Sequence, residues 1–319
     1  MLFLGADIGR TTRFALVDET GRLHQQSRVP TDIRSGRAFV NGLIAAFREA
    51  IEKASAPVGA AGIGLPGLVD HHTQQIEVLT NFLNISAIDL HGECERALGI
   101  PVIFDNDANL AAFAEWQCGA AQGATDAVLI TLGRGIGCGL ILKGELQRGA
   151  RGFAGEFGHT KIGNEPIECS CGASGCLETV VSGPNIVRRT RELLFLDPRF
   201  THSTLVSKMR IKLTCEDVVD AAKFGDELAR TVLEDTARSL GIAISNIINL
   251  LNVEKVVLGG PVMGAGDFLL ASIREEVARN AFAPLLVRCS IVTGTLGNDA
   301  GMIGAGLLAK RELEQAPPK

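Results

Sequence analysis

The chain has 319 residues, of which 46% are hydrophobic and 21% are charged, and its formal net charge is −5. This length and composition predict a soluble globular protein with room for two domains, and the scattered Lys and Arg residues predict no binding to nucleic acid. No apolar run reaches the length of a membrane span, and the first residues enter a strand pattern without the basic segment of a signal peptide.

Two strand–turn–strand patterns, one in each half of the chain, carry glycines at their turns. The first covers Leu2–Asp18, with Asp7 at the end of its first strand, and the second covers Ala127–Leu142. The turn of the first pattern consists of Gly9, Arg10, Thr11 and Thr12. Such a turn can offer backbone N–H groups and hydroxyls to a phosphate, with Asp7 facing a hydrated Mg²⁺. An ordinary hairpin bend is the alternative, because Asp and Gly are common there.

A helix and a buried strand follow the first hairpin. Apolar periodicity predicts a helix over Val40–Ala54. The strand covers Ala60–Val69 and contains a Pro66-Gly67 bend, which is a plain strand-to-loop turn when judged on its residues alone.

Three polar residues end the next predicted strand. Within Pro101–Glu115 an apolar strand runs into Asp105-Asn106-Asp107 and then into a helix. Asp107 or Asn109 can cap that helix, but three consecutive Asp and Asn residues exceed what one cap needs. The excess indicates a functional role at this strand end.

The third feature is a cluster of His159, Cys169, Cys171 and Cys176. Gly172 and Gly175 allow sharp backbone turns, so that the three sulfurs can converge, and the histidine completes the tetrahedral set that Zn²⁺ prefers. A buried cysteine cluster or a disulfide is the alternative, but Cys-x-Cys does not bridge to itself comfortably. The five other cysteines are isolated in sequence, which favours a reducing cytoplasm over a disulfide framework.

Further elements are predicted after the cluster. They are helices over Arg188–Phe195, Glu216–Leu228 and Asp226–Leu251, a strand that breaks into a glycine turn over Lys255–Pro261, a strand over Ser290–Thr293 and a small-residue helix over Asn298–Ala309. No G-x-x-x-x-G-K-[ST] motif occurs, and no G-x-G-x-x-G follows a strand, so P-loop, dinucleotide-binding and protein-kinase interpretations fail.

The run around His159–Glu178, G-H-x9-C-x-C-G-x2-G-C-x-E, resembles the signature of the ROK family of repressors, open reading frames and kinases. The resemblance extends from about Leu4 to Leu308. It implies an α/β fold with two lobes of the actin-like ATPase (ribonuclease-H-like) type and an inserted zinc-binding loop. The small domain would cover 1–117 and be completed by the terminal helix at 299–319, and the large domain would cover 118–298. The cleft between them would hold sugar and nucleotide.

The resemblance also implies roles for individual residues. Asp107 corresponds to the catalytic base. The implied sugar contacts are Gly67, Asn81, Asn106, Asp107, Glu156, His159 and Glu178. The implied nucleotide contacts are Asp7, Gly9, Arg10, Thr11, Thr12, Gly133, Arg134, Gly135, Gly259 and Gly260. The family pattern has glycine where Arg10 stands and threonine where Arg134 stands, so each arginine either binds phosphate or points to solvent.

The implied activity is ATP-dependent phosphorylation of glucose or a related aldohexose at its 6-hydroxyl, with Mg²⁺ on the nucleotide and a structural Zn²⁺. The partners expected are the sugar, ATP and a second copy of the chain. The alternatives are a kinase for an N-acetylhexosamine (GlcNAc or ManNAc) or for allose, a catalytically inactive sugar-binding protein, and a sugar-responsive ROK regulator. ROK repressors carry an N-terminal helix-turn-helix, whereas this chain begins with its first strand, so an enzyme is expected.

Overall fold

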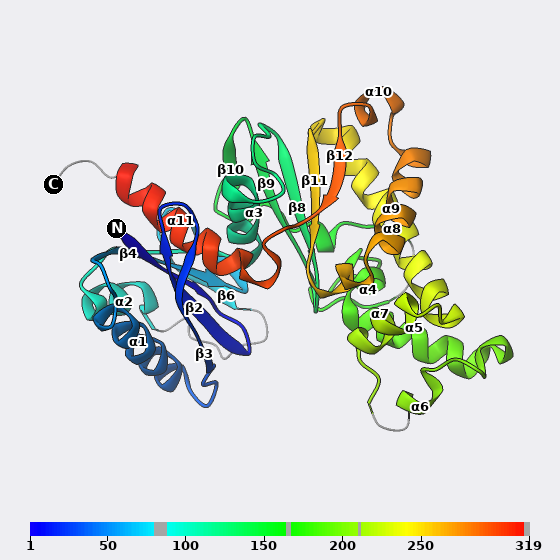
Figure 1. The fold of residues 1–319 in the computed structure, drawn as a ribbon, viewed down its shortest axis with the longest axis horizontal. Helices are drawn as coiled ribbons and strands as arrows, with labels where there is room; N and C mark the ends of the chain where they lie inside the picture. The colour runs from blue at the N-terminus through cyan, green and yellow to red at the C-terminus, as the bar shows by residue number, and fades with distance from the viewer. Residues whose placement is uncertain (80–87, 164–166, 210–211, 316–319) are drawn as a thin grey trace. The chain divides into compact units, whose positions relative to one another are not determined.

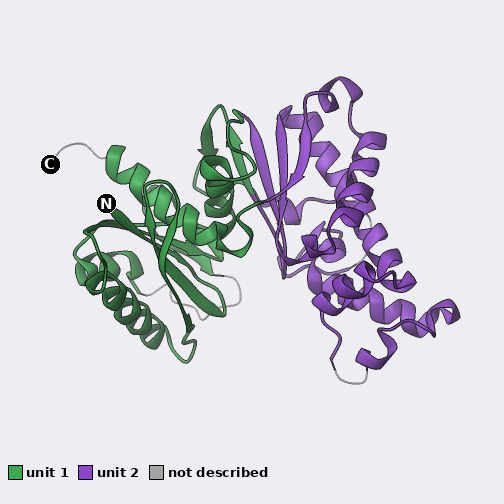
Figure 2. Ribbon diagram, in the orientation of Figure 1, with its two compact units in different colours: residues 1–125, 139–155, 295–319 green, residues 126–138, 156–294 purple. Residues whose placement is uncertain are grey.

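The computed structural model describes residues 1–79, 88–163, 167–209 and 212–315. The chain forms two compact units (Figure 2). Unit 1 comprises residues 1–125, 139–155 and 295–319, and unit 2 comprises 126–138 and 156–294. This division differs from the predicted domains mainly at residues 139–155, which pack with unit 1.

Unit 1 is built on a five-stranded sheet with the order β3-β2-β1-β4-β7, in which Figure 1 labels β2, β3 and β4. The predicted first hairpin is confirmed, because β1 and β2 pair antiparallel, whereas β4 lies parallel to both β1 and β7. A separate two-stranded sheet consists of β5 and β6. The strand bounds are β1 Leu2–Asp7, β2 Thr11–Asp18, β3 Leu23–Pro30, β4 Val58–Leu65, β5 Gly67–Val69, β6 Ile76–Leu79 and β7 Val102–Asn106.

The described residues of unit 1 form four α-helices. They are α1 Gly36–Glu52, α2 Leu90–Leu98, α3 Asp107–Cys118 and α11 Ala300–Gln315. The helix α1 begins four residues before the predicted start, because the Ser35 side chain accepts a hydrogen bond from the Ala38 backbone N–H and caps it. The C-terminal helix packs on β1, β4 and α3.

Glycines allow this close approach of α11 to the sheet. A Cβ atom on Gly62 of β4 would overlap the backbone carbonyl of Ala305, and one on Gly304 would overlap that of Leu110 in α3. The small-residue composition of α11 is therefore a packing requirement, because any larger side chain at these contacts would push the helix away.

The second sheet has the order β10-β9-β8-β11-β12. Within unit 2, β11 pairs in parallel with both β8 and β12. The strands are β8 Ala127–Leu132, β9 Ile136–Leu142, β10 Glu145–Gln147, β11 Lys255–Gly259 and β12 Ser290–Thr293. The predicted second hairpin, with Gly133, Arg134 and Gly135 at its turn, is thus confirmed.

Unit 2 carries most of the helices. They are α4 Glu178–Val181, α5 Gly183–Leu196, α6 Val206–Met209, α7 Cys215–Lys223, α8 Glu227–Leu251, α9 Asp267–Asn280 and α10 Ala283–Leu286. The predicted continuous helix over Glu216–Leu228 is wrong. Gly225 adopts a positive φ of 87°, which stops α7, and Asp226 then caps α8 by accepting from the Ala229 N–H. Among the described residues, no helix combines the length and hydropathy that a bilayer crossing needs.

Candidate active site

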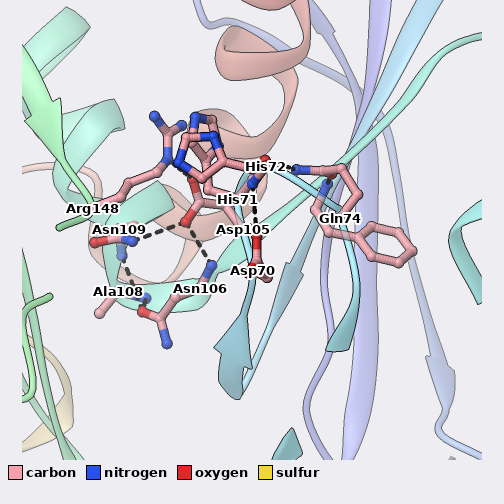
Figure 3. A network of polar contacts seen from close by, with 10 residues as sticks. Asp70, His71, His72, Gln74, Asp105, Asn106, Ala108, Asn109 and Arg148 are labelled. Atoms are coloured by element: carbon pink, nitrogen blue, oxygen red, sulfur yellow. Dashed lines mark hydrogen bonds and ion pairs between the residues drawn. The ribbon is translucent and has the colours of Figure 1, made fainter. Parts of the chain in front are cut away.

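The turn from β7 into α3 presents three polar residues in succession, Asp105, Asn106 and Asp107, of which Figure 3 labels the first two. Asp105 is buried, and its carboxylate accepts hydrogen bonds from the Asn106 backbone N–H at 2.7 Å and from the Asn109 side-chain amide at 2.9 Å. It also forms an ion pair with Nε of Arg148 at 2.6 Å. The first residue of the polar triplet is thus fully engaged by protein groups.

The second residue, Asn106, caps α3. Its Oδ1 accepts hydrogen bonds from the backbone N–H groups of Ala108 and Asn109, at 2.9 and 3.3 Å. The alternative in which Asp107 or Asn109 serves as the helix cap is therefore wrong, because the extended backbone of Asn106 makes that residue the cap.

Asp107 is the first residue of α3 and is half-buried. One carboxylate oxygen lies 2.8 Å from the backbone nitrogen of Ala108. A negatively charged side chain in the first turn of a helix is stabilised by the unpaired backbone N–H groups and the helix dipole, so a carboxylate suits this position.

Gly67 is tied to the same turn. The Asn106 side-chain amide donates to the Gly67 carbonyl at 3.0 Å. Gly67 has a φ of 146°, and a Cβ atom there would overlap the carbonyl oxygen of Val78 on β6. The bend therefore requires glycine, and two predicted sugar contacts, Gly67 and Asn106, are brought together. A third, Asn81, lies outside the described residues.

At the first hairpin turn, one of the predicted phosphate contacts has a buried side chain and two have exposed side chains. Arg10 and Thr11 are exposed, whereas Thr12 is fully buried and its hydroxyl bonds to that of Thr31 at 2.9 Å. Asp7 forms an ion pair with Arg13. The backbone N–H groups of the turn remain the principal means by which these residues could meet a phosphate.

In unit 2 the predicted metal ligands converge. The ligand atoms of the cluster all lie within 4.8 Å of one another, and the cluster consists of His159, Cys169, Cys171 and Cys176. Nδ1 of His159 is 3.5 Å from Sγ of Cys169, and the Cys171 and Cys176 sulfurs are 3.8 Å apart. Burial raises the pKa of the Cys169 thiol, whereas a hydrogen bond from the Ala173 backbone N–H lowers the pKa of Cys171.

These distances fit zinc. In a tetrahedral site with Zn–S bonds of about 2.3 Å, neighbouring ligand atoms are about 3.8 Å apart. Gly172 and Gly175 both have positive φ angles, 84° and 74°, which bring the loop back on itself so that the sulfurs can meet.

His159 connects this cluster to a carboxylate. Its Nδ1 faces the sulfurs, and its Nε2 lies 3.6 Å from the Glu156 carboxylate. Burial raises the pKa of Glu156, His159 lowers it, and the Glu178 carboxylate raises it again. A metal on Nδ1 would leave Nε2–H as a donor directed at Glu156.

Glu178 contacts both the second hairpin and the loop that carries the cysteine cluster. Its Oε2 accepts a hydrogen bond from the Ile136 backbone N–H at 2.9 Å, and its Oε1 lies 3.4 Å from the Ser170 hydroxyl. A Cβ atom on Gly135 would come within 2.6 Å of the same carboxylate, which explains the glycine at that turn.

The glycine turn after β11 lies against this hairpin. Gly260 has a φ of 89°, and a Cβ atom there would come within 2.5 Å of the Leu132 carbonyl. A Cβ atom on Gly133 would lie 3.8 Å from the Pro261 ring. Predicted nucleotide contacts from both turns, Gly133 and Gly260, are therefore neighbours within unit 2, whereas Arg134 is exposed.

Two features of the site could not be predicted from the sequence. The contact of Arg148 with Asp105 was not predicted, because a single arginine beside a glycine is common at the surface. The contact of Glu178 with Ile136, across 42 residues, could not be read from either segment alone.

Residues 3–312 match the model of the ROK family, and the chain belongs to that family. The chain is 36% identical to a glucokinase from Halalkalibacterium halodurans, over 97% of this chain and 95% of that relative.

Among solved structures, a ROK glucokinase from Streptomyces griseus in complex with glucose and AMPPNP has a TM-score of 0.83 and 31% identity, covering 98% of this chain and 100% of that one. A ROK hexokinase from Thermus thermophilus has a TM-score of 0.82 and 28% identity, with 99% and 100% covered. The predicted α/β fold with two sheets and the predicted family are therefore confirmed.

Proposed function

We propose that this protein is an ATP-dependent glucokinase that transfers the γ-phosphoryl group of ATP to the 6-hydroxyl of glucose. The observation that carries the proposal is its similarity, over 98% of the chain, to a ROK glucokinase that was solved with glucose and an ATP analogue. The similarity to a bacterial glucokinase over nearly the whole of both chains supports the same substrate.

Asp107 is the general base in this proposal. The 6-hydroxyl oxygen of glucose attacks the γ-phosphorus, the bond from that phosphorus to the β–γ bridging oxygen breaks, and ADP leaves with the electron pair. The hydroxyl proton passes to the Asp107 carboxylate. In a loose transition state this proton leaves late, so a carboxylate of ordinary basicity suffices.

The sugar hydroxyls are bound by backbone and side-chain groups that the two units fix separately. Gly67 and Asn106 hold one another in unit 1, and Glu156, His159 and Glu178 surround the cysteine cluster in unit 2. Asn81 is a further proposed contact. Carboxylate and imidazole groups suit hydroxyl ligands, because each hydroxyl can donate to one group and accept from another.

Zinc is a structural ion in this proposal, held by His159, Cys169, Cys171 and Cys176. When bound, it would fix the loop that carries the sugar-binding residues and would orient the His159 ring. The convergence of four ligand atoms at tetrahedral spacing supports this role.

The nucleotide is proposed to bind through the two hairpin turns and the turn after β11, with Mg²⁺ neutralising charge on its phosphates. The contacts proposed are Asp7, Gly9, Arg10, Thr11, Thr12, Gly133, Arg134, Gly135, Gly259 and Gly260. The partly or fully exposed glycines at these three turns support this assignment, because backbone N–H groups at such turns can bind phosphate.

We also propose a cytoplasmic homodimer. All eight cysteines, each within the described residues, are free thiols, which is typical of a reducing compartment. Several large apolar side chains of unit 2 are exposed and would be suitable for burial against a second copy; they are Phe195, Phe224, Leu250 and Val287.

A phosphorylation screen tests the proposal. Purified protein is incubated with ATP and Mg²⁺ and with glucose, mannose, fructose, allose, N-acetylglucosamine or N-acetylmannosamine, and ADP formation is followed by a coupled assay. We expect the highest kcat/KM for glucose. A higher value for allose or an N-acetylhexosamine would replace glucose as the substrate, and the absence of ADP formation with every sugar would leave a sugar-binding protein without kinase activity.

A further inference from the structure

Asp105 is a buried carboxylate without a part in the proposed reaction. Its side chain is 5% exposed, and that of its partner Arg148 is 12% exposed. Burying a charged pair carries a large desolvation penalty, and such pairs contribute little net stability compared with apolar residues of similar size. The pair therefore calls for an explanation other than stability.

The contacts of Asp105 fix the turn that carries Asn106 and Asp107 (Figure 3). The carboxylate accepts from the backbone N–H of Asn106 at 2.7 Å, which orients the peptide just before the helix cap. It also accepts from Nδ2 of Asn109, one helical turn into α3, at 2.9 Å. Asp107 lies between these two attachment points, so its backbone is held from both sides.

The backbone of Arg148 lies in a closed loop. It follows β10, and its carbonyl accepts a hydrogen bond from the Ala154 N–H at 2.9 Å, which closes the loop. The same loop packs on the end of β5, where a Cβ atom on Gly152 would come within 2.5 Å of the Val69 carbonyl. The guanidinium thus reaches Asp105 from a loop that is closed on itself and packs on β5 of the same unit.

We propose that Arg148, acting through Asp105, is a positioning residue for catalysis, which holds the β7–α3 turn so that Asp107 is aligned with the sugar hydroxyl. This inference rests on the proposed kinase function. We call the Asp105–Arg148 ion pair the brace. Since a displacement of about 1 Å can lower a rate on the order of a hundredfold, loss of the brace lowers turnover even where the fold survives.

The experiment compares four variants of the full chain. Arg148→Met removes the charge and keeps the stem, Asp105→Asn keeps the shape, and the double variant removes both charges, so that no unpaired charge is left buried. The control is Arg151→Met, an exposed arginine of the same loop that pairs with Asp70 and Glu77. We measure kcat with glucose, KM for ATP, and amide hydrogen exchange of the peptide covering residues 102–110 without ligands.

We expect Arg148→Met to lower kcat by about tenfold or more, with KM for ATP within about twofold, and to speed exchange in the 102–110 peptide. The double variant should fold but keep the lowered kcat. Arg151→Met should have the kcat, the KM for ATP and the exchange rate of the wild type. If Arg148→Met does not fold, the kcat of the double variant tests the inference instead.

A double variant with wild-type kcat would overturn the inference, because the pair would then contribute only to stability. An Arg148→Met variant with kcat within twofold of the wild type, or with unchanged exchange at 102–110, would do the same, as would an equal loss in Arg151→Met. The exchange measurement needs no activity, so it tests the brace even if the wild-type protein phosphorylates none of the sugars and the proposed function fails.

Discussion

At the residue scale, Asp107 combines a helix-start position with a chemical role. Asp107 is the first residue of α3. Hydrogen bonds to the Asn106 and Asp105 side chains hold the turn in which it lies. None of these neighbouring groups can take its place, because each is already engaged in holding the turn. Among these residues, Asp107 is therefore the one that we propose as the proton acceptor.

We predict that Asp107→Asn lowers kcat by about a hundredfold to ten-thousandfold while KM for glucose changes little, because the amide keeps the shape but cannot accept the proton. Steady-state kinetics of glucose phosphorylation measure both quantities. Asp89→Asn is the matched control, since Asp89 caps α2 in the same unit and asparagine caps equally well. A variant that keeps most of its kcat would assign the base to another residue.

The two arginines at the hairpin turns lead to a second residue-scale prediction. Arg10 and Arg134 are exposed, and a guanidinium is well suited to phosphate oxygens. We predict that Arg10→Gly or Arg134→Thr raises KM for ATP by about tenfold, since a charge-assisted hydrogen bond contributes about 1.5–3 kcal/mol.

The controls are the exposed arginines Arg22 and Arg288, changed to Gly and Thr respectively. Unchanged kinetics in both test variants would show that Arg10 and Arg134 are surface residues, and a lower KM for ATP would show that they obstruct the donor.

At the scale of elements, residues 156–163 and 167–178 carry both the proposed metal ligands and several of the proposed sugar contacts. His159 faces the sulfurs with one ring nitrogen and Glu156 with the other, and Glu178 contacts both the loop and the second hairpin. Loss of one ligand therefore disturbs groups that are proposed to bind the sugar.

We predict one zinc per chain in the purified protein and its loss in Cys171→Ser, together with a KM for glucose raised by about tenfold or more, because thiolate loss opens a closed tetrahedral site. Elemental analysis and steady-state kinetics give the two readouts. Cys289→Ser, outside the cluster, should keep both zinc and affinity. A Cys171→Ser protein that binds glucose normally would separate the sugar site from the metal.

At the scale of the whole molecule, the environment of His71 predicts that stability depends on pH. Burial lowers the pKa of His71 from its ordinary value of 6.5, and the positive charge of Arg148 acts in the same direction. Below about pH 6.5 the unfolded chain binds a proton at this histidine that the folded protein resists, so stability is present above that pH and is lost as the pH falls.

We predict that the midpoint of thermal unfolding falls less between pH 8 and pH 5.5 in His71→Gln than in the wild type. Circular dichroism melts at several pH values measure this, with the exposed His72→Gln as control. Parallel curves for the wild type and His71→Gln would rule out the titration of His71 as a source of acid sensitivity.

The sequence alone determined the features that depend on short-range geometry. Both glycine hairpins, the polar strand end at Asp105–Asp107 and the four ligands of the cysteine cluster follow from residues close together in the chain, where spacing and turn preferences limit the backbone to a few conformations. The helix break between α7 and α8 was missed because an apolar pattern continues across Gly225.

Only the tertiary structure decided which distant segments meet. Asp105 and Arg148 are 43 residues apart, Gly67 and Asn106 are 39 apart, and Glu178 and Ile136 are 42 apart. Hydrophobic periodicity shows which face of an element is buried, but not which element lies beside it. Sheet order and helix packing determine that, and the partners of a buried charge follow from them.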